Sequence, residues 1–219
     1  ILYRLVGSEM CIRDRVKIFG GWSRGQNQKS LSIFARSQYG YSSFEYPLFP
    51  NSEVSAYEAF VLRNSGNDWT SSMLRDGFIT DLADNTDIDH QLYRPAVIYL
   101  NGEYWGIQNI REKVNEHFLS SHHDIPSEHI DLLDIQGIYS ENIVHGTNID
   151  YLNLLDYLEN NDIEDSSVQS GIEGWIDINS FMQYQAFQIF IDNRDWPGNN
   201  IKFWRDHRTS GKWRWILYD

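Results

Sequence analysis

The sequence has little cysteine and no long apolar run, and each shortage excludes a class of protein. Its one cysteine is Cys11. A single thiol excludes an internal disulfide framework and cysteine-based metal sites. No stretch approaches the roughly 18 consecutive apolar residues that a membrane-spanning helix requires, and no charged-then-apolar signal peptide is visible. We therefore expect no membrane partner for these residues.

Basic residues are scarce as well. Only 18 Lys and Arg stand against 31 Asp and Glu, which gives a formal net charge of −13. A chain of this charge repels polyanions, which argues against non-specific binding to nucleic acid or to an anionic membrane. An acidic protein that handles a nucleotide needs a local source of positive charge, either a bound metal or a few placed Lys and Arg side chains.

What the sequence does contain is typical of a folded domain. Hydrophobic residues make up 41% and aromatic residues 15% of the 219 positions, which excludes a disordered chain. Residues 1–15 resemble translated sequencing-adapter read-through, so we treat them as non-native and place the domain at residues 16–219. The sequence stops within a predicted strand, at Trp215–Asp219, and we expect a fragment truncated at both ends.

The first half of the domain is predicted to be rich in strands. Val16–Phe19 and Glu58–Arg63 favour strands, and in Lys29–Ala35 apolar residues alternate with serines, the pattern of a half-buried strand. A helix is predicted from a cap at Thr70 to about Leu82. Its core stripe would consist of Leu74, Phe78 and Leu82.

The clearest local signal is Asn101-Gly102 between two strand-forming runs, which predicts a hairpin. Helices are predicted at Glu112–Ser121, at Ile149–Leu158 and at Ile178–Ile191. The last of these would be capped by Asp177 and would present Ile178, Met182, Ala186 and Ile189 on one face. A second hairpin, with strands at 201–205 and 212–218, ends the chain. This order predicts an α+β fold with a strand-rich lobe at 16–110 and a helix-rich lobe at 111–219.

Several polar residues have the order that phosphoryl transfer requires. Asp195 and Asn200 lie five residues apart in one irregular loop, the spacing between the base and the metal-binding Asn of kinase catalytic loops. Asp219 follows the next hairpin, and Lys29 begins a strand behind a glycine-bearing loop. Each has a plainer alternative, because Asp and Asn favour turns, a strand lysine is usually solvated, and Asp219 is the last residue given.

The motifs together resemble one family. Arg24-Gly25 with Lys29-Ser30-Leu31, then Asn101–Gly106 running into Arg111-Glu112-Lys113, then Asp195 with Asn200 and the final Trp215–Asp219, are similar to the CotH kinase family. That resemblance implies a divergent protein-kinase-like two-lobed fold. It also implies that ATP, with Mg²⁺ or with Mn²⁺ or Ca²⁺ in its place, is used to phosphorylate Ser or Thr on protein substrates. Members include a bacterial spore-coat kinase and large exported proteins, so the resemblance implies an extracellular or cell-surface location within a longer exported chain.

Roles follow by position from this resemblance. Lys29, Arg24 and Glu112 would bind the nucleotide, Asp195 would be the catalytic base, and Asn200 with Asp219 would hold the metal. Asp192 is an alternative base with a less suitable spacing to Asn200. Glu112 fits a ribose or adenine contact better than a pairing with Lys29. For that pairing Asp68 and Asp76 are the candidates.

Other features favour structural roles. The histidines His117, His122 and His123 lack the i, i+4 spacing of helical metal ligands. Trp213 and Trp215 alternate in a strand and are expected to pack against a sheet face, as are Trp196 and Trp204, although one of them could cover the adenine. The acidic stretch Glu159–Asp165 is expected to be a solvated helix end and loop. Two rival functions remain open: a catalytically inactive kinase-like module for surface attachment, and a carbohydrate-binding module suggested by the aromatic content.

Overall fold

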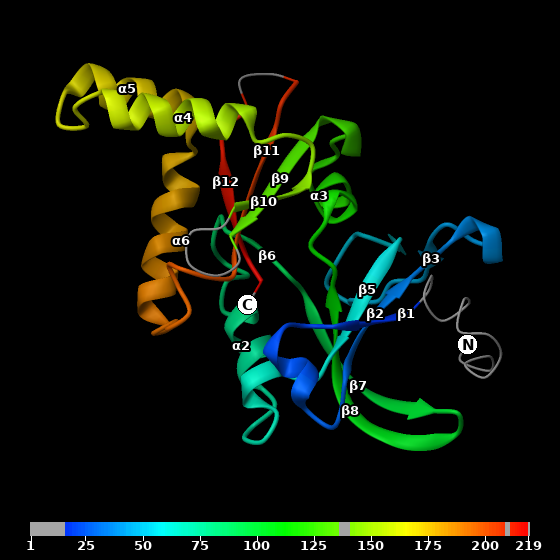
Figure 1. The fold of residues 1–219 in the computed structure, drawn as a ribbon. Coiled ribbons are helices and arrows are strands. Elements are labelled where there is room, and N and C mark those ends of the chain that lie inside the picture. Colours follow the sequence, from blue (N-terminus) through cyan, green and yellow to red (C-terminus); the bar gives the residue numbers. More distant parts are fainter. Residues whose placement is uncertain (1–15, 136–140, 209–210, 219) are drawn as a thin grey trace. The chain divides into compact units, whose positions relative to one another are not determined.

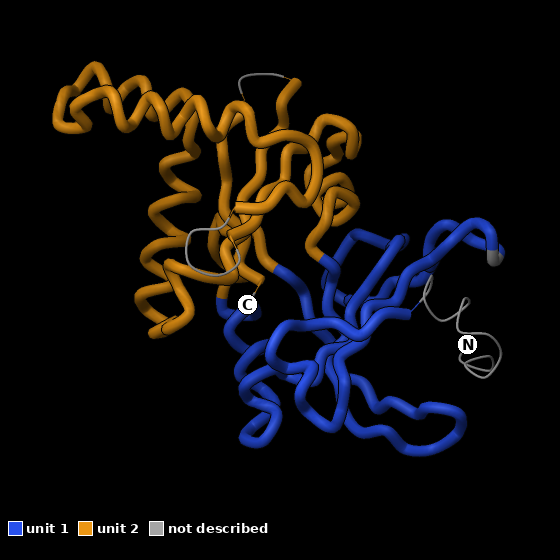
Figure 2. Tube along the Cα trace, in the orientation of Figure 1, with its two compact units in different colours: residues 1–82, 91–113 blue, residues 83–90, 114–219 orange. Residues whose placement is uncertain are grey.

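The computed structural model describes residues 16–135, 141–208 and 211–218, and it confirms the predicted mixture of helices and strands. The chain divides into two compact units (Figure 2). Unit 1 contains the described residues up to Leu82 together with Gln91–Lys113, and unit 2 contains Ala83–His90 and Val114 onward. Residues 83–90, predicted within the first lobe, therefore belong to the second compact unit.

Unit 1 is organised around an antiparallel sheet of five strands in the spatial order β1-β2-β5-β8-β7 (Figure 1). The strands are β1 (Val16–Phe19), β2 (Ser30–Phe34), β5 (Ala59–Arg63), β7 (Tyr93–Leu100) and β8 (Glu103–Glu112). Around it lie the short pair β3 (Phe44–Glu45) and β4 (Ala56–Tyr57), the helix α2 (Arg75–Asp81), and the 3-10 turns η1 (Trp22–Gly25), η2 (Ser37–Tyr39) and η3 (Gly66–Asp68). The predicted strands of the first half are thus confirmed as one sheet.

Strand β2 buries its serines and not the apolar residues that alternate with them. Ser30 and Ser32 are 1% and 3% exposed, while Leu31 and Ile33 are only half-buried. The Ser30 hydroxyl donates to Asn64 Oδ1 at 2.8 Å and accepts a hydrogen bond from the Asn64 backbone N–H at 2.9 Å. Because the buried hydroxyl is satisfied, its desolvation is offset. The centre of unit 1 is consequently polar on this side of the sheet.

Helix α2 starts later than predicted and is capped by a different residue. Its first backbone N–H groups are held by the Asp68 carboxylate, which accepts from Leu74 at 3.0 Å and from Arg75 at 3.1 Å. Thr70 lies in the turn before the helix and does not cap it. The prediction of a cap at Thr70 was wrong, because a carboxylate from the preceding 3-10 turn reaches the same N–H groups.

The predicted core stripe of α2 is exposed. Its members are 64%, 56% and 43% accessible: Leu74, Phe78 and Leu82. The buried residues of the helix are Gly77 and Thr80. A Cβ atom on Gly77 would lie 2.5 Å from Tyr93 of β7, so the helix approaches the strand too closely for any larger side chain. Packing distance, and not apolar periodicity, decides which face is buried.

The Asn101-Gly102 hairpin forms as predicted between β7 and β8. Both turn residues have positive φ, 52° and 86°, as a type I′ turn requires, and Leu100 pairs with Glu103. The strand continues through Glu112, however, and the next helix, α3 (Glu116–His123), begins only after Asn115 caps it. The predicted helix start at Glu112 was therefore wrong.

Unit 2 contains a second sheet of five strands, in the spatial order β10-β9-β11-β12-β6. Its strands are β6 (Asp89–His90), β9 (Ile130–Ile135), β10 (Glu141–His145), β11 (Ile201–Asp206) and β12 (Arg214–Leu217). The pair β6–β12 is parallel and the others are antiparallel. The remaining elements are α3, η4 (Ser127–His129), α4 (Ile149–Asn160), α5 (Ser166–Trp175) and α6 (Ile178–Phe190). The final hairpin is confirmed, whereas β9, β10 and α5 were missed.

Two apolar clusters cover the two faces of this sheet. On one face Leu132, Trp204 and Ile216 pack with Phe118 and Leu119 of α3. On the other, the buried residues are Leu133, Leu154, Ile176, Ile201, Phe203 and Trp213, with Trp196 and Trp215 packed against them. The expectation that the tryptophans pack against the sheet is confirmed.

In the described part of the chain, no helix combines the length and the apolar character needed to cross a bilayer.

Candidate functional site

The loop between α6 and β11 carries the predicted base and one predicted metal ligand. Within it, Asn200 Nδ2 donates to Asp195 Oδ2 at 3.4 Å. Asn200 has a positive φ of 56°, a conformation that asparagine tolerates better than most residues, and β11 begins at the next residue. The structure therefore brings Asp195 and Asn200 together, with the asparagine fixed at the start of a buried strand.

This pair leaves oxygen atoms available for chemistry. Because the Asn200 NH₂ group faces Asp195, its carbonyl oxygen is directed elsewhere and can accept a ligand. Asp195 is an exposed residue, so a substrate can approach its side chain. Amide and carboxylate oxygens are the ligands that Mg²⁺ prefers. The donor set on this loop thus fits both a base and part of a magnesium site.

Asp192, the alternative base, has a different environment. Its Oδ2 accepts hydrogen bonds from Arg194 Nε at 3.1 Å and from Arg194 Nη2 at 3.0 Å. The two side chains are 77% and 86% exposed. The Asp192 carboxylate is thus paired with Arg194, whereas the Asp195 carboxylate accepts a hydrogen bond from Asn200. The geometry favours Asp195 of the two.

The last strand ends beside this loop. In the β11–β12 hairpin Lys202 lies opposite Ile216, so the start of β11 and the end of β12 are at the same end of the pair. Asp219, the second predicted metal ligand, lies outside the described residues, and its role stays a prediction. Within residues 16–135, 141–208 and 211–218, no group of three or more His, Cys, Asp and Glu side chains could hold a metal ion.

Lys202 is a cation at this end of the sheet that the sequence did not single out. Its side chain is 12% exposed, and its Nζ lies 3.6 Å from Asp134 Oδ2 and 5.3 Å from the centre of the Tyr218 ring. Burial lowers the pKa of Lys202, and the Asp134 and Glu116 carboxylates oppose that shift. A strand lysine has no local signal of burial, because only the pairing of β11 with β9 brings Asp134 beside it.

Lys29, the predicted phosphate ligand, lies in unit 1 and is engaged by its own loop. Its Nζ donates to the backbone oxygens of Arg24 at 2.6 Å and of Gln26 at 2.7 Å. Arg24 is an exposed residue of η1. The lysine closes the Gly20–Gln28 loop upon itself. Contacts of Lys29 and Arg24 with a nucleotide stay predictions.

Neighbouring side chains anchor this loop to β8. The Gln28 amide donates to the backbone oxygens of Trp105 at 3.1 Å and of Ile107 at 3.2 Å. Between them Gly106 has a φ of 124°, and a Cβ there would lie 2.5 Å from Gln28 Nε2. Glycine is therefore required where the loop meets the strand.

Glu112 and the two candidate partners of Lys29 are occupied otherwise. Glu112 is 2% exposed, and its Oε2 accepts the Leu92 N–H at 3.0 Å. Asp68 caps α2, as described above. Asp76 pairs with arginines and not with Lys29. A ribose or adenine contact of Glu112 is untested, and the described contacts give Lys29 no acidic partner.

The Asp76 centre was missed by the sequence analysis. Its Oδ2 lies 2.7 Å from Arg63 Nε and 2.7 Å from Arg111 Nη1, and the Arg111 side chain is 1% exposed. Burial would raise the pKa of Asp76, but the charges of Arg111 and Arg63 outweigh it and lower the pKa. Since the three residues come from β5, α2 and β8, no local spacing reveals the cluster.

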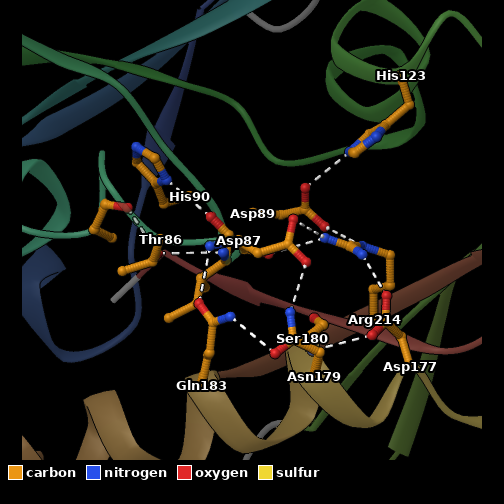
Figure 3. A network of polar contacts seen from close by, with 12 residues as sticks. Thr86, Asp87, Asp89, His90, His123, Asp177, Asn179, Ser180, Gln183 and Arg214 are labelled. Carbon is orange, nitrogen blue, oxygen red and sulfur yellow. Dashed lines mark hydrogen bonds and ion pairs between the residues drawn. The ribbon is translucent and has the colours of Figure 1, made fainter.

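A second charged centre, in unit 2, was also missed (Figure 3). Asp89 of β6 accepts hydrogen bonds from His123 Nε2 at 2.8 Å and from Arg214 Nε at 3.3 Å. It accepts a third from Trp204 Nε1 at 2.9 Å. Arg214 also pairs with Asp177 and Asp87. This network fixes residues 83–90 to α3, β11 and β12, and it accounts for their place in unit 2.

Comparison with known proteins identifies the family. The sequence model of the family described as CotH kinase protein matches residues 16–219, a range that includes Lys29, Asp195 and Asn200. No curated protein matches the chain. The match begins at Val16, where the sequence analysis placed the start of the domain, and it confirms the resemblance seen in the motifs. The chain belongs to the CotH kinase protein family.

Proposed function

We propose that this chain is the catalytic part of an exported protein kinase with a divergent two-lobed kinase fold. It transfers the γ-phosphoryl group of ATP to a Ser or Thr hydroxyl on a protein substrate. Two findings support the proposal. One is membership of the CotH kinase family, and the other is the loop in which Asn200 lies 3.4 Å from Asp195. The second observation carries the mechanism, because it joins the predicted base to a predicted metal ligand.

In this mechanism Asp195 acts on the acceptor. Its carboxylate accepts the proton of the Ser or Thr hydroxyl as the hydroxyl oxygen forms a bond to the γ-phosphorus. The bond from the γ-phosphorus to the bridging oxygen breaks, and ADP leaves with that oxygen. The hydrogen bond from Asn200 holds the carboxylate in place during this transfer. Asp195 is exposed, as a residue that meets a protein substrate must be.

The metal and nucleotide contacts extend the proposal. Asn200 and Asp219 would hold Mg²⁺, or Mn²⁺ or Ca²⁺, which when bound supplies positive charge to the phosphates. Lys29 has three N–H donors, and the carbonyls of Arg24 and Gln26 use two of them. The third donor of Lys29 and the exposed Arg24 guanidinium would contact phosphate oxygens, and Glu112 would contact the ribose or adenine.

Labelled ATP provides the direct test. The chain is incubated with γ-labelled ATP, Mg²⁺ and a generic acceptor such as casein, beside the variants Asp195→Ala and Asp192→Ala. We expect Asp195→Ala to lower the rate by roughly 10²–10⁴-fold, the usual contribution of a general base, while nucleotide binding persists. Asp192→Ala, the matched control on the same loop, should keep most of the activity. Transfer by Asp195→Ala at the wild-type rate would refute the role of this residue.

A second candidate function is favoured by the state of Lys29. Its ammonium is already held by two loop carbonyls, as expected of a lysine that only stabilises a loop. A module of this kind would serve surface attachment or assembly without catalysis. A thermal shift discriminates the two, because a ligand that binds only the folded state at 100 times its Kd stabilises it by about 2.7 kcal/mol. Stabilisation by ATP with Mg²⁺ supports the kinase, and its absence supports the scaffold.

A further inference from the structure

The buried face of α6 is polar, which reverses the face predicted from the sequence. Ser180, Tyr184 and Gln188 are at most 1% exposed, whereas the predicted stripe, which includes Met182 and Ile189, is accessible to solvent. A buried amide costs free energy unless its donors and acceptor are satisfied. The contacts of Gln188, at the last turn of this helix, therefore indicate why an amide is placed there.

Gln188 holds the first part of the loop that follows the helix. Its side-chain Oε1 accepts a hydrogen bond from Asn193 Nδ2 at 2.8 Å. Its backbone oxygen accepts one from the Asn193 N–H at 3.1 Å. Asn193 is thus attached to the helix end through both its side chain and its backbone.

Asn193 passes this constraint to the predicted base. Its Oδ1 accepts a hydrogen bond from the backbone N–H of Asp195 at 3.1 Å. The amide orientation is set by Gln188, because the Asn193 NH₂ group is directed at Gln188 Oε1 and the Asn193 oxygen consequently faces Asp195. A continuous chain of hydrogen bonds leads from the interior of α6 to Asp195.

The inner end of this series of hydrogen bonds is buried. Gln188 lies one turn after Tyr184, whose side chain is completely buried. Burial raises the pKa of Tyr184 well above its usual range, and the Gln188 side chain opposes that shift. Gln188 therefore follows a buried, neutral phenol on the same face of α6.

We propose that Gln188 is a positioning residue for Asp195, acting through Asn193. The proposal rests on the proposed function, since it assigns a role in the transfer that Asp195 performs. Gln188 does not touch the substrate; it fixes the backbone of residue 195 so that the carboxylate meets Asn200. Asp192 does not take part in this series of hydrogen bonds. Its carboxylate pairs with Arg194, and its φ of 52° turns the backbone out of the helix.

The test compares three substitutions on α6. Gln188→Met keeps the length of the side chain and removes the acceptor, while Gln188→Glu keeps an oxygen that can accept from Asn193. Gln185→Met makes the same chemical change at a half-buried position of the same helix and is the matched control. For each folded protein, kcat and the KM for ATP are measured, and the Asp195 amide is followed by ¹⁵N NMR and hydrogen exchange without nucleotide.

We expect Gln188→Met to lower kcat by roughly 10–100-fold with little change in KM, since small displacements of a catalytic group have effects of this size. Its Asp195 amide should shift and exchange faster than in the wild type. Gln188→Glu should retain more of both properties, and Gln185→Met should match the wild type. A folded Gln188→Met protein with wild-type kcat and an unchanged Asp195 amide would overturn the proposal.

Two further outcomes keep the inference separate from the proposed function. If the wild type transfers no phosphate, the kinase assignment fails, and the Asp195 amide alone decides whether Gln188 positions the loop. If Gln188→Met does not fold, Asn193→Ala and Asn193→Asp replace it, because only the aspartate keeps an oxygen for the Asp195 N–H. Equal Asp195 amide signals in those two variants and in the wild type would refute the proposal that Gln188 and Asn193 position Asp195.

Discussion

Asp76 in unit 1 and Asp89 in unit 2 both lie among cations with little exposure, but their partners differ. In unit 1, Asp76 lies between the guanidinium groups of Arg63 and Arg111, and the three side chains are 9%, 12% and 1% exposed. In unit 2, Asp89 is 11% exposed and receives a histidine, an indole and a single arginine. That arginine has two further carboxylates beside it, Asp177 and Asp87.

The difference indicates that the stability lost with a buried carboxylate depends on which other groups its cations contact. Both side chains around Asp76 are guanidinium groups, which are cations in proteins. Arg111 has in addition the neutral side chain of Gln91, which accepts from its Nη2 at 2.9 Å. Loss of Asp76 would leave two guanidinium groups close together in a buried site. Loss of Asp89 would leave Arg214 with Asp177 and Asp87.

The largest effect is expected from Asp76→Asn. Removing one partner of a buried ion pair usually costs about 3–5 kcal/mol, because a buried charge is left uncompensated. We expect a loss of this size in the free energy of unfolding of unit 1, measured by urea unfolding and by amide hydrogen exchange in β5 and β8. Asp81→Asn, at the exposed end of the same helix, is the control and should change stability little. A smaller loss in the free energy of unfolding than that of Asp89→Asn would contradict the proposed difference between the two centres.

A smaller effect is expected from Asp89→Asn. The variant keeps one oxygen to accept a hydrogen bond, and Arg214 keeps its other carboxylates, so the cost should be about 1–3 kcal/mol. The loss should appear as faster amide exchange in β6 and β12. Asp87→Asn is the matched control: Asp87 is 52% exposed, and a pair of that exposure contributes about 0–1 kcal/mol. Equal losses in the two variants would mean that burial of Asp89 has no special importance.

Neither centre could have been predicted from the sequence, whereas several local features could. The Asn101-Gly102 turn and the Asp177 cap of α6 depend on neighbouring residues only, and both form as predicted. The Asp89–Arg214 pair joins residues 125 positions apart, through a parallel pairing of β6 with β12 that no local pattern announces. Neighbouring residues thus predict turns and caps, whereas the pairing of residues far apart in the sequence cannot be predicted from them.

Faces were predicted less well than elements, for a physical reason. In α2 the close approach at Gly77 and in α6 the hydrogen-bonded Gln188 put small or polar residues inside, while apolar stripes stay outside. Periodicity marks a face as apolar, but hydrogen bonds and packing distance decide which face is buried. For the candidate site, the sequence placed Asp195 and Asn200 on one loop, and the structure adds a hydrogen bond between them, while their roles stay predictions. The support from Gln188 and Asn193 was missed, because its signal is a glutamine on the face that periodicity assigns to solvent.

Acidification should produce the smallest effect, and it compares the two centres directly. For both carboxyls burial would raise the pKa, but hydrogen bonds and charges outweigh it and lower the pKa, from Arg111 and Arg63 at Asp76 and from His123, Arg214 and Trp204 at Asp89. A carboxyl with a lowered folded pKa stabilises the protein fully above its unfolded pKa, about 3.9. That contribution is lost as the pH falls through the folded pKa. Neither carboxyl should therefore make stability depend on pH between 7 and 5, and the loss should begin only near pH 4.

The measurement is urea unfolding of the wild type, Asp76→Asn and Asp89→Asn at intervals from pH 7 to pH 3. At pH 3 a carboxyl with a lowered pKa is only partly protonated in the folded state, so less stability is lost than by substitution. Each variant should lose less stability on acidification than the wild type, because it lacks one carboxyl that must be protonated. Identical acid dependence in all three proteins would show that neither centre contributes to it.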